Sequence, residues 1–257
     1  MLKKIALLST LAMCMGSTYA YQAEVGAGFS YYDAEYVDMT YARAYALDGK
    51  FYLQAVEEKD SPLNEAAFLN RASNITGKIV YLEAPNLRTN QYNVGVEYFI
   101  PNSNFYLNTQ FEYYKEDDDL WDVESSEKVY TAEIGYLPAD GLLVAAGFTS
   151  THGDFVEDHA ATLRTKYVMP IANMDLNLEA NAKFGEEDIY YGLATDLYLN
   201  KTLSVGVAYQ NSNSTFNDDQ QLKLNVKKFF SPNISLELKA DFYEYYECYG
   251  VRLGYRF

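Results

Sequence analysis

The last nine residues of the chain alternate between two kinds of side chain. Phe257, Tyr255, Leu253, Val251 and Tyr249 share one parity, and the positions between them hold only glycine or arginine. A period of two is the spacing of a β-strand with one apolar and one polar face. The pattern predicts an amphipathic strand here, and it leaves open whether lipid or a protein core covers the apolar face.

The first twenty residues predict export. Lys3 and Lys4 precede an apolar run over residues 5–15, and small residues follow up to Ala20, where a signal peptidase would cut. The apolar run is too short to span a bilayer as a helix. We therefore expect a cleaved signal peptide over residues 1–20.

Residues 21–257 are then enough for a single large domain. Cys14 lies in the apolar run, but Met13 is too large for the position before a lipidated cysteine, so we expect cleavage rather than acylation. After cleavage Cys248 is the only cysteine, and no intramolecular disulfide can form.

Charge and composition exclude several classes. The chain has 36 acidic and 20 basic side chains, a formal net charge of −16, which argues against nucleic acid as a partner. It also has 26 Tyr and 14 Phe, and tyrosine suits a boundary between apolar and polar surroundings. No segment after residue 20 has the 18 consecutive apolar residues of a membrane helix.

The same alternation recurs along the chain between two kinds of connection. Some connections are tight turns, such as Pro-Asn-Ser-Asn at 101–104. Others are longer, acidic and irregular, at 115–128, 150–159, 185–188 and 211–221. Short turns on one side and longer loops on the other are typical of outer-membrane barrels.

We therefore predict an all-β fold, a transmembrane antiparallel up-and-down β-barrel of about fourteen strands. The second and third strands are the least regular, so twelve strands is the alternative. A soluble β-sandwich or β-solenoid is disfavoured, because no strand is apolar on both faces. The strands are expected near residues 21–32, 40–54, 73–83, 89–100, 105–115, 127–137, 142–150, 159–169, 175–184, 189–198, 203–211, 221–230, 234–243 and 247–257.

The polar side chains at every second position of these strands should face the lumen. They include eight acids and nine bases, so the wall is nearly balanced in charge. Fourteen strands enclose more space than side chains usually fill, and we expect no loop long enough to fold in as a plug, so an aqueous pore is predicted. The predicted lumen-lining residues are Glu24, Lys78, Glu97, Glu112, Glu133, Arg164, Lys166, Glu179, Lys183, Asp196, Lys223, Lys227, Glu237, Lys239, Asp241, Arg252 and Arg256.

Excess acid lies in the predicted extracellular loops, above all at Asp117, Asp118 and Asp119. A ring of negative carboxylates raises the local cation concentration over about a Debye length, roughly 8 Å at physiological ionic strength. We therefore expect mild cation selectivity. The other predicted mouth acids are Glu116, Asp122, Glu124, Glu127, Asp154, Glu157, Asp158, Glu186, Glu187, Asp188, Asp218 and Asp219.

Catalytic and metal-binding patterns are weak. His152 and His159 are the only histidines, and Ser150 and Glu157 lie near them, so nucleophilic attack or binding of a divalent metal would have to use this stretch. No G-x-S-x-G or H-E-x-x-H pattern is present. We expect no enzyme, no cofactor and no metal, an exposed loop position for Trp121, and a wall position for Cys248.

The segment SPLNEAAFLNRAS at 61–73 breaks the alternation. Together with DGKFYLQAV before it and the YRF ending, it resembles the general bacterial porin family of Gram-negative outer membranes, in which a P-L-x-E-A-A-F-L pattern follows the first hairpin. The resemblance implies a channel and supplies no catalytic or ligand residue. Its residues predict a short periplasmic helix or turn that packs Leu63, Phe68 and Leu69 against the barrel mouth; a contact site for a periplasmic partner is the alternative.

We therefore predict an outer-membrane porin for passive diffusion of small hydrophilic solutes and ions. Expected partners are outer-membrane lipid, lipopolysaccharide, the solutes, and an assembly machinery that reads Phe257 and Tyr255 at the closing strand. The alternatives are a structural or adhesive barrel with acidic surface loops and a barrel enzyme centred on His152 and His159.

Overall fold

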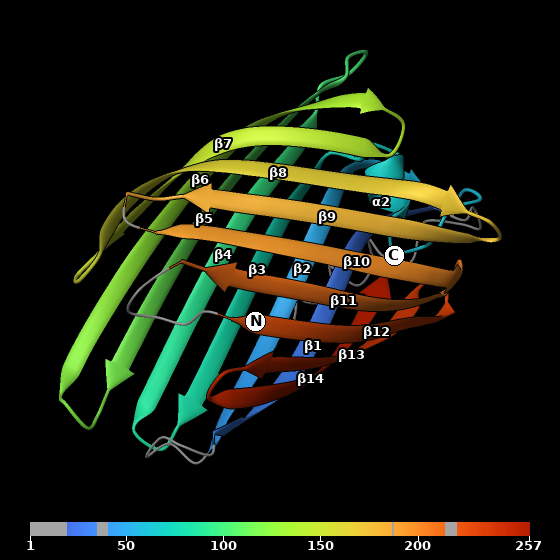
Figure 1. Cartoon of the computed structure of the whole chain (residues 1–257). Coiled ribbons are helices and arrows are strands. Elements are labelled where there is room, and N and C mark those ends of the chain that lie inside the picture. The colour runs from blue at the N-terminus through green and yellow to red at the C-terminus, as the bar shows by residue number, and fades with distance from the viewer. Residues whose placement is uncertain (1–19, 35–40, 187, 214–219) are drawn as a thin grey trace, which may run out of the picture.

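A computed structural model of the chain describes residues 20–34, 41–186, 188–213 and 220–257 (Figure 1). These described residues form fourteen strands and one short helix. Among them, no helix has the length and apolarity that a membrane span requires. The elements are β1 (Ala20–Ala34), β2 (Tyr41–Glu57), α2 (Ala66–Leu69), β3 (Asn74–Ala84), β4 (Leu87–Phe99), β5 (Phe105–Asp118), β6 (Val123–Ala139), β7 (Leu142–Gly153), β8 (Glu157–Ile171), β9 (Met174–Phe184), β10 (Ile189–Asn200), β11 (Leu203–Ser212), β12 (Gln221–Ser231), β13 (Ile234–Tyr243) and β14 (Tyr246–Arg256).

The strands close into one antiparallel barrel in chain order, since β1 pairs with β2 on one side and with β14 on the other. The fourteen-strand prediction is confirmed, and the twelve-strand alternative is wrong. Each predicted strand overlaps one of these strands. The predicted signal peptide lies outside the described residues except for Ala20, which begins β1, so it stays a prediction.

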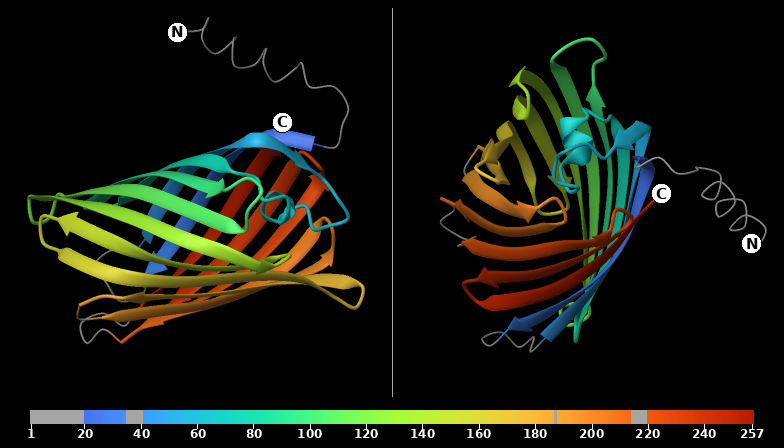
Figure 2. Two further views of the ribbon diagram at one scale, coloured as in Figure 1. Left: turned by 90° about the horizontal axis from the view of Figure 1, so that it is seen from above. Right: turned by 90° about the vertical axis from the view of Figure 1, so that its right-hand side faces the viewer.

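Connections alternate between two ends of the barrel. The end where β1 begins and β14 ends is called the terminal end here, and the opposite end is called the loop end. Within the described residues, the terminal end holds 58–73, 100–104, 140–141, 172–173, 201–202 and 232–233, and the loop end holds 85–86, 119–122, 154–156 and 244–245. Figure 2 shows α2 at the same end of the barrel as the C-terminus.

Two stretches expected as irregular acidic loops are mostly strand. Only residues 119–122 connect β5 to β6, and only 154–156 connect β7 to β8. The ladder continues through the acids, where Asp117 pairs with Glu124. Lys115 lies 3.1 Å from the first carboxylate and 3.2 Å from the second. This shared cation offsets the repulsion of like charges that face each other across the ladder.

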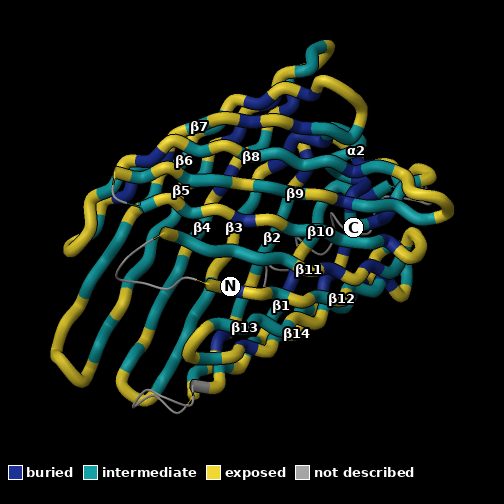
Figure 3. Tube along the Cα trace, in the orientation of Figure 1, coloured by how far each residue is buried: buried dark blue, intermediate teal, exposed yellow. Residues whose placement is uncertain are grey.

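The outer face of the barrel is apolar and exposed. Leu47 is 64% exposed and Leu193 is 60% exposed, and Figure 3 shows exposed and more buried positions alternating along the strands. An apolar outer band is what a membrane barrel presents to lipid. Buried apolar residues gather instead in two clusters: Tyr21, Tyr52, Val56, Ala66 and Ala72 in the first, and Phe99, Tyr106, Leu137 and Leu143 in the second.

Candidate functional site

The longest connection is residues 58–73, and it folds into the terminal end of the barrel. The expectation that no loop could fold in was wrong. Within this segment α2 forms one turn, and Arg71 at φ 52° adopts the left-handed conformation that ends it. The Asn70 amide secures the turn by donating to the carbonyl oxygen of Ala66 at 2.6 Å. Residues 58–73 are called the inner segment below.

Both apolar clusters receive residues of the inner segment. Ala66 has no exposed surface and belongs to the cluster with Tyr21 and Tyr52. Phe68 packs against the other cluster, and the Lys166 ammonium lies 5.2 Å from the centroid of its ring. The sequence predicted a short helix or turn that packs Leu63, Phe68 and Leu69 against the barrel mouth. The structure has the helix and the Phe68 contact, but the segment lies inside the lumen.

Glu65 reaches from the inner segment to the far wall. Its side chain is buried, its Oε2 lies 2.8 Å from the Lys166 Nζ on β8, and its Oε1 accepts a hydrogen bond from the Tyr198 hydroxyl on β10. A buried carboxylate needs partners of this kind to offset its loss of water. At the surface of the same segment, Lys201 pairs with Asp60 and lowers the pKa of that carboxyl.

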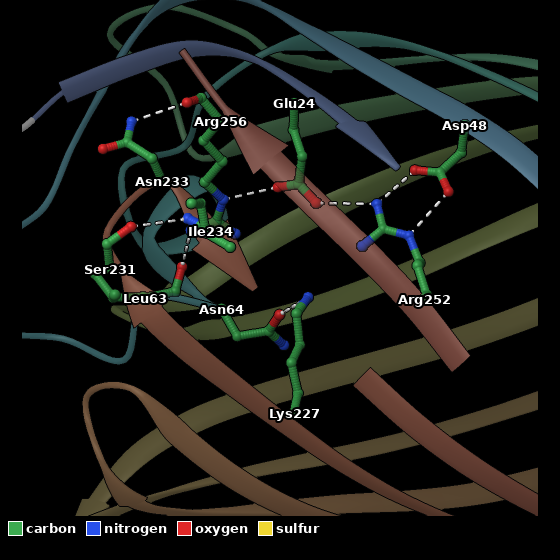
Figure 4. Close-up of polar contacts among 10 residues, drawn as sticks. All are labelled: Glu24, Asp48, Leu63, Asn64, Lys227, Ser231, Asn233, Ile234, Arg252 and Arg256. Atoms are coloured by element: carbon green, nitrogen blue, oxygen red, sulfur yellow. Dashed lines mark hydrogen bonds and ion pairs between the residues drawn. The ribbon is translucent and has the colours of Figure 1, made fainter. Parts of the chain in front are cut away.

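Backbone and amide groups of the inner segment also bind another region of the wall (Figure 4). The Leu63 carbonyl accepts from Arg256 Nη1 at 2.9 Å, and the Leu63 N–H donates to the Lys201 carbonyl at 2.9 Å. Lys227 Nζ donates to Asn64 Oδ1 at 2.6 Å. The inner segment therefore crosses the lumen, and hydrogen bonds and ion pairs join it to the wall at β8, β10, β12 and β14.

Ion pairs surround this crossing, beginning at the seam of the barrel. Arg252 donates to Asp48 at 2.8 and 2.5 Å and to Glu24 at 3.1 Å, while Arg256 Nε donates to Glu24 at 2.8 Å. Gly26 makes room for the guanidinium, because a Cβ at this position would lie 2.4 Å from Arg252 Nη2.

A second group of ion pairs and charged hydrogen bonds lies on the wall from β4 to β9. Arg164 donates to Glu133 at 2.9 Å, and Lys166 pairs with Glu179 at 2.8 Å. Among the described residues Glu97 has no cation at this range, and it accepts from the Tyr106 hydroxyl at 2.6 Å. Each acid also accepts from an asparagine amide, in the pairs Asn74 with Glu97, Asn108 with Glu133, and Asn177 with Glu179. The two groups of ion pairs together are called the ionic belt.

A cavity of about 370 Å³ lies between the inner segment and the ionic belt. Charges of both signs line it, including Lys50, Glu97 and Arg164. The Oδ1 atom of Asn74 also lines this region, and it has no hydrogen-bond partner in the part of the chain that is described. A polar cavity with free acceptors is a site for water.

The charges predicted to line the lumen all lie on the wall face opposite the exposed apolar residues. Examples are Lys227, which pairs in register with Glu237, and Glu24, which pairs with Arg256. Their role in permeation stays a prediction. Asp48 and Lys50 on the irregular second strand, and Glu65 of the inner segment, are not among the predicted lumen residues. The signal for Glu65 is its place within a run of otherwise apolar and small side chains.

Those predicted mouth acids that the structure describes lie at the loop end, and several are compensated. Asp119 pairs with Arg88 at 2.7 Å, and Lys115 pairs with Asp117. Asp118 Oδ1 instead accepts from two backbone N–H groups of the 119–122 turn. The predicted mouth acids Glu187, Asp218 and Asp219 lie outside the described residues.

The histidine stretch forms a side-chain cluster. Ser150 Oγ lies 2.9 Å from His152 Nε2 and 3.0 Å from His159 Nδ1, and His152 Nδ1 lies 3.6 Å from a carboxylate oxygen of Glu157. Among the residues that the structure describes, no group of three or more His, Cys, Asp or Glu side chains is arranged to hold a metal ion.

The closing strand is bonded to the first strand through its last residue. The Phe257 carbonyl accepts from Ala23 N at 2.9 Å, and Phe257 N donates to the Ala23 carbonyl at 3.0 Å. The Phe257 ring stacks on Tyr255 with 6.0 Å between centroids. Trp121 is 74% exposed at the loop end, and Cys248 is a buried wall residue, as expected.

Comparison with known proteins places these features in a family. The sequence matches the family described as "Putative general bacterial porin" over residues 1–154. The solved structure of Omp33, an outer membrane protein of Acinetobacter baumannii, is 28% identical, with a TM-score of 0.74, and the match covers 94% of this chain and 100% of that one. Comparison with curated protein sequences gave no match.

Two further solved structures share the fold alone. CdiB from Acinetobacter baumannii is 6% identical with a TM-score of 0.56, and the match covers 92% of this chain and 60% of that one. A bacterial polysaccharide outer membrane secretin is 12% identical with a TM-score of 0.50, and the match covers 94% of this chain and 100% of that one.

A closed antiparallel barrel with an apolar outer face and a charged interior defines the class as an outer-membrane β-barrel channel. Because the family match spans more than half of the chain, this protein belongs to the general bacterial porin family, as the inner segment and the strand pattern predicted. Family and fold are those of a channel.

Proposed function

We propose that the lumen is a path for passive diffusion of small hydrophilic solutes and ions, with a mild preference for cations. Support for the preference comes from uncompensated acid at the loop end. Within the described residues, Glu116, Asp122 and Glu186 have no ion-pair partner there. This observation carries the proposal, because fixed negative charge at a mouth raises the local cation concentration.

The narrow part of the path lies at the terminal end. The inner segment and the ionic belt occupy that part of the lumen. The charges of the belt are paired with each other or, at Glu97, hydrogen-bonded to uncharged side chains. The belt therefore restricts size more than it selects sign, and only small solutes pass beside it. Rings of unpaired charges of one sign would select ions more strongly.

The preference for cations should depend on salt. Exposed carboxylates act over about a Debye length, roughly 10 Å at 0.1 M and 3 Å at 1 M ionic strength. At high salt the field of the mouth acids no longer reaches the middle of the opening. We expect the selectivity to fade accordingly.

Planar-bilayer recording of the refolded protein tests this function. Conductance steps should appear, and the reversal potential across a tenfold KCl gradient should have the cation-selective sign at low salt and approach zero at high salt. An absence of conductance steps would refute the channel, and an anion-selective sign would refute the role of the mouth acids.

A further inference from the structure

A cluster of reactive side chains lies on the outside of the barrel, on the same face as the exposed Phe148. Ser150 on β7 pairs in register with His159 on β8, and His152 pairs with Glu157 one step nearer the loop end. All four lie on the same face of the sheet as Phe148, which pairs with Ala161 and is 52% exposed on the outer face. The cluster therefore lies at the border of the apolar band nearest the loop end, on the outer face of the wall and outside the lumen.

The atoms of the cluster are in an order suited to general-base activation. With the Nδ1–H tautomer of His152 directed at Glu157 (3.6 Å), Nε2 is free to accept the proton of Ser150 Oγ (2.9 Å). Hydroxyl, imidazole and carboxylate in this sequence form the activated nucleophile of serine hydrolases on several unrelated folds. The contact with Glu157 is longer than a hydrogen bond, and catalytic contacts of this kind often shorten only when substrate binds.

The other histidine supplies a second contact to the same oxygen. His159 Nδ1 lies 3.0 Å from Ser150 Oγ, and its ring stacks on Phe148 at 5.8 Å with 23° between planes. An Nδ1–H at this place donates to the hydroxyl in the resting state. It is also within reach of an oxyanion that forms on the carbon bonded to that oxygen.

An apolar groove ends at the same serine. Its volume is about 420 Å³, and it runs over the outer wall from β4 to β7. Its lining includes Val94, Val96, Phe111, Phe148 and Ser150. Because the groove lies on the lipid-facing side and is mostly apolar, a hydrocarbon chain is the ligand that fits it.

We propose that this cluster is an esterase site for the acyl esters of membrane lipids, with the acyl chain in the groove and the ester carbonyl at Ser150. Oγ attacks the carbonyl carbon while His152 Nε2 takes the hydroxyl proton. His152 then gives that proton to the alkoxy oxygen as the carbon–oxygen bond breaks, which releases an alcohol and leaves an acyl-serine. Water attacks this ester, and its proton returns through His152 to Oγ as the carboxylic acid departs. Glu157 is a positioning residue that holds the imidazole tautomer.

The site and the channel are independent. Thr149 and Thr151, which flank Ser150 on β7, point to the inside and are buried. The proposed esterase therefore uses the outer wall, and the diffusion path uses the opposite face of the same strands.

The refolded full-length protein in detergent micelles tests the proposal with a fluorophosphonate probe and with p-nitrophenyl decanoate. The wild type should take one label and turn over the ester. Ser150→Ala should lose both, whereas Thr149→Ala, a matched change on the inner face of the same strand, should keep both. His152→Ala should lower kcat by about 10² or more, the usual contribution of a general base.

The Glu157→Gln variant separates positioning from mere packing. It should lower kcat with KM unchanged, and Glu157→Asp should restore part of the rate. Heat-modifiable migration and unchanged conductance verify that each variant is a folded barrel. A folded wild type without label or turnover, or a Ser150→Ala variant that retains them, would overturn the esterase and would leave the diffusion channel untouched.

Discussion

Acidic side chains at the two ends of the barrel have different surroundings. At the terminal end Glu65 is 3% exposed and is bonded to Lys166 and Tyr198 across the lumen. At the loop end Asp119 also has a cation, Arg88, but both side chains are about half exposed. Charge at the terminal end holds an internal segment in place, whereas charge at the loop end is exposed to solution, where we propose that it attracts cations.

Removing the inner segment should have the largest effect on conduction. Replacement of residues 61–72 by a short Gly-Ser linker takes away the helix, its apolar contacts and its bonds to the far wall. We expect a several-fold rise in single-channel conductance, measured in planar bilayers. Replacement of 119–122 at the loop end by a tight turn is the control and should change conductance little. Equal conductance of the two variants would show that the terminal end is not the narrow part.

Glu65→Ala should loosen the terminal end without removing it. The change leaves Lys166 buried with one partner fewer, and breaking a buried ion pair typically costs about 3–5 kcal/mol. We expect lower resistance to urea in lipid vesicles and larger current fluctuations. Asp119→Ala at the exposed pair of the loop end should leave the urea midpoint unchanged. If the two variants respond alike, the contrast between the ends fails.

Deletion of Phe257 should weaken closure of the barrel. The residue makes three backbone hydrogen bonds to Gln22 and Ala23 of β1, each with a net value of about 1 kcal/mol. We expect a smaller fraction of heat-modifiable barrel on gels after folding, also because we propose that assembly machinery reads this residue. Trp121→Ala, an aromatic change at the loop end, should assemble normally. Normal assembly of the truncated chain would contradict the terminal-signal proposal.

Neutralising three mouth acids should have the smallest effect. The triple variant Asp117→Asn, Asp118→Asn and Asp119→Asn removes negative charge that is partly compensated by Arg88 and Lys115. We expect a reduced cation preference at low salt and no difference at 1 M KCl, where screening is nearly complete. Reversal potentials decide the matter, and an unchanged potential at low salt would remove these acids from permeation.

The strands of the barrel wall could be predicted from the sequence, because the alternation of side chains that marks a strand is a pattern of neighbouring residues. Alternation of apolar and other side chains sets which face of each strand meets lipid, and this pattern located even the irregular β2 and β3. The extent of β5 and β6 was misjudged at 115–128. A run of acids there was interpreted as a loop, although Lys115 compensates two carboxylates and lets the ladder continue.

The interior of the terminal end could not be predicted in the same way. The role of Glu65 depends on Lys166 and Tyr198, which are more than a hundred residues away along the chain. No periodicity relates these positions. The cluster around Ser150 is similar, because its histidines were visible in the sequence but the register that brings them to one oxygen, and to the outer face, was not.

The contacts of the inner segment also imply an order of events during folding. Leu63 and Arg256 are separated by 193 residues, Asn64 and Lys227 by 163, and Glu65 and Tyr198 by 133. Contacts at such separations form late, because the loop between them must first be closed. The contacts of Ala66 with Tyr52 and Val56 of β2 join residues that are close in the chain and do not need a closed barrel. The bonds of Leu63, Asn64 and Glu65 to β14, β12 and β10 can form only after those strands are in place, so the segment is held across the lumen only once the last strand has joined.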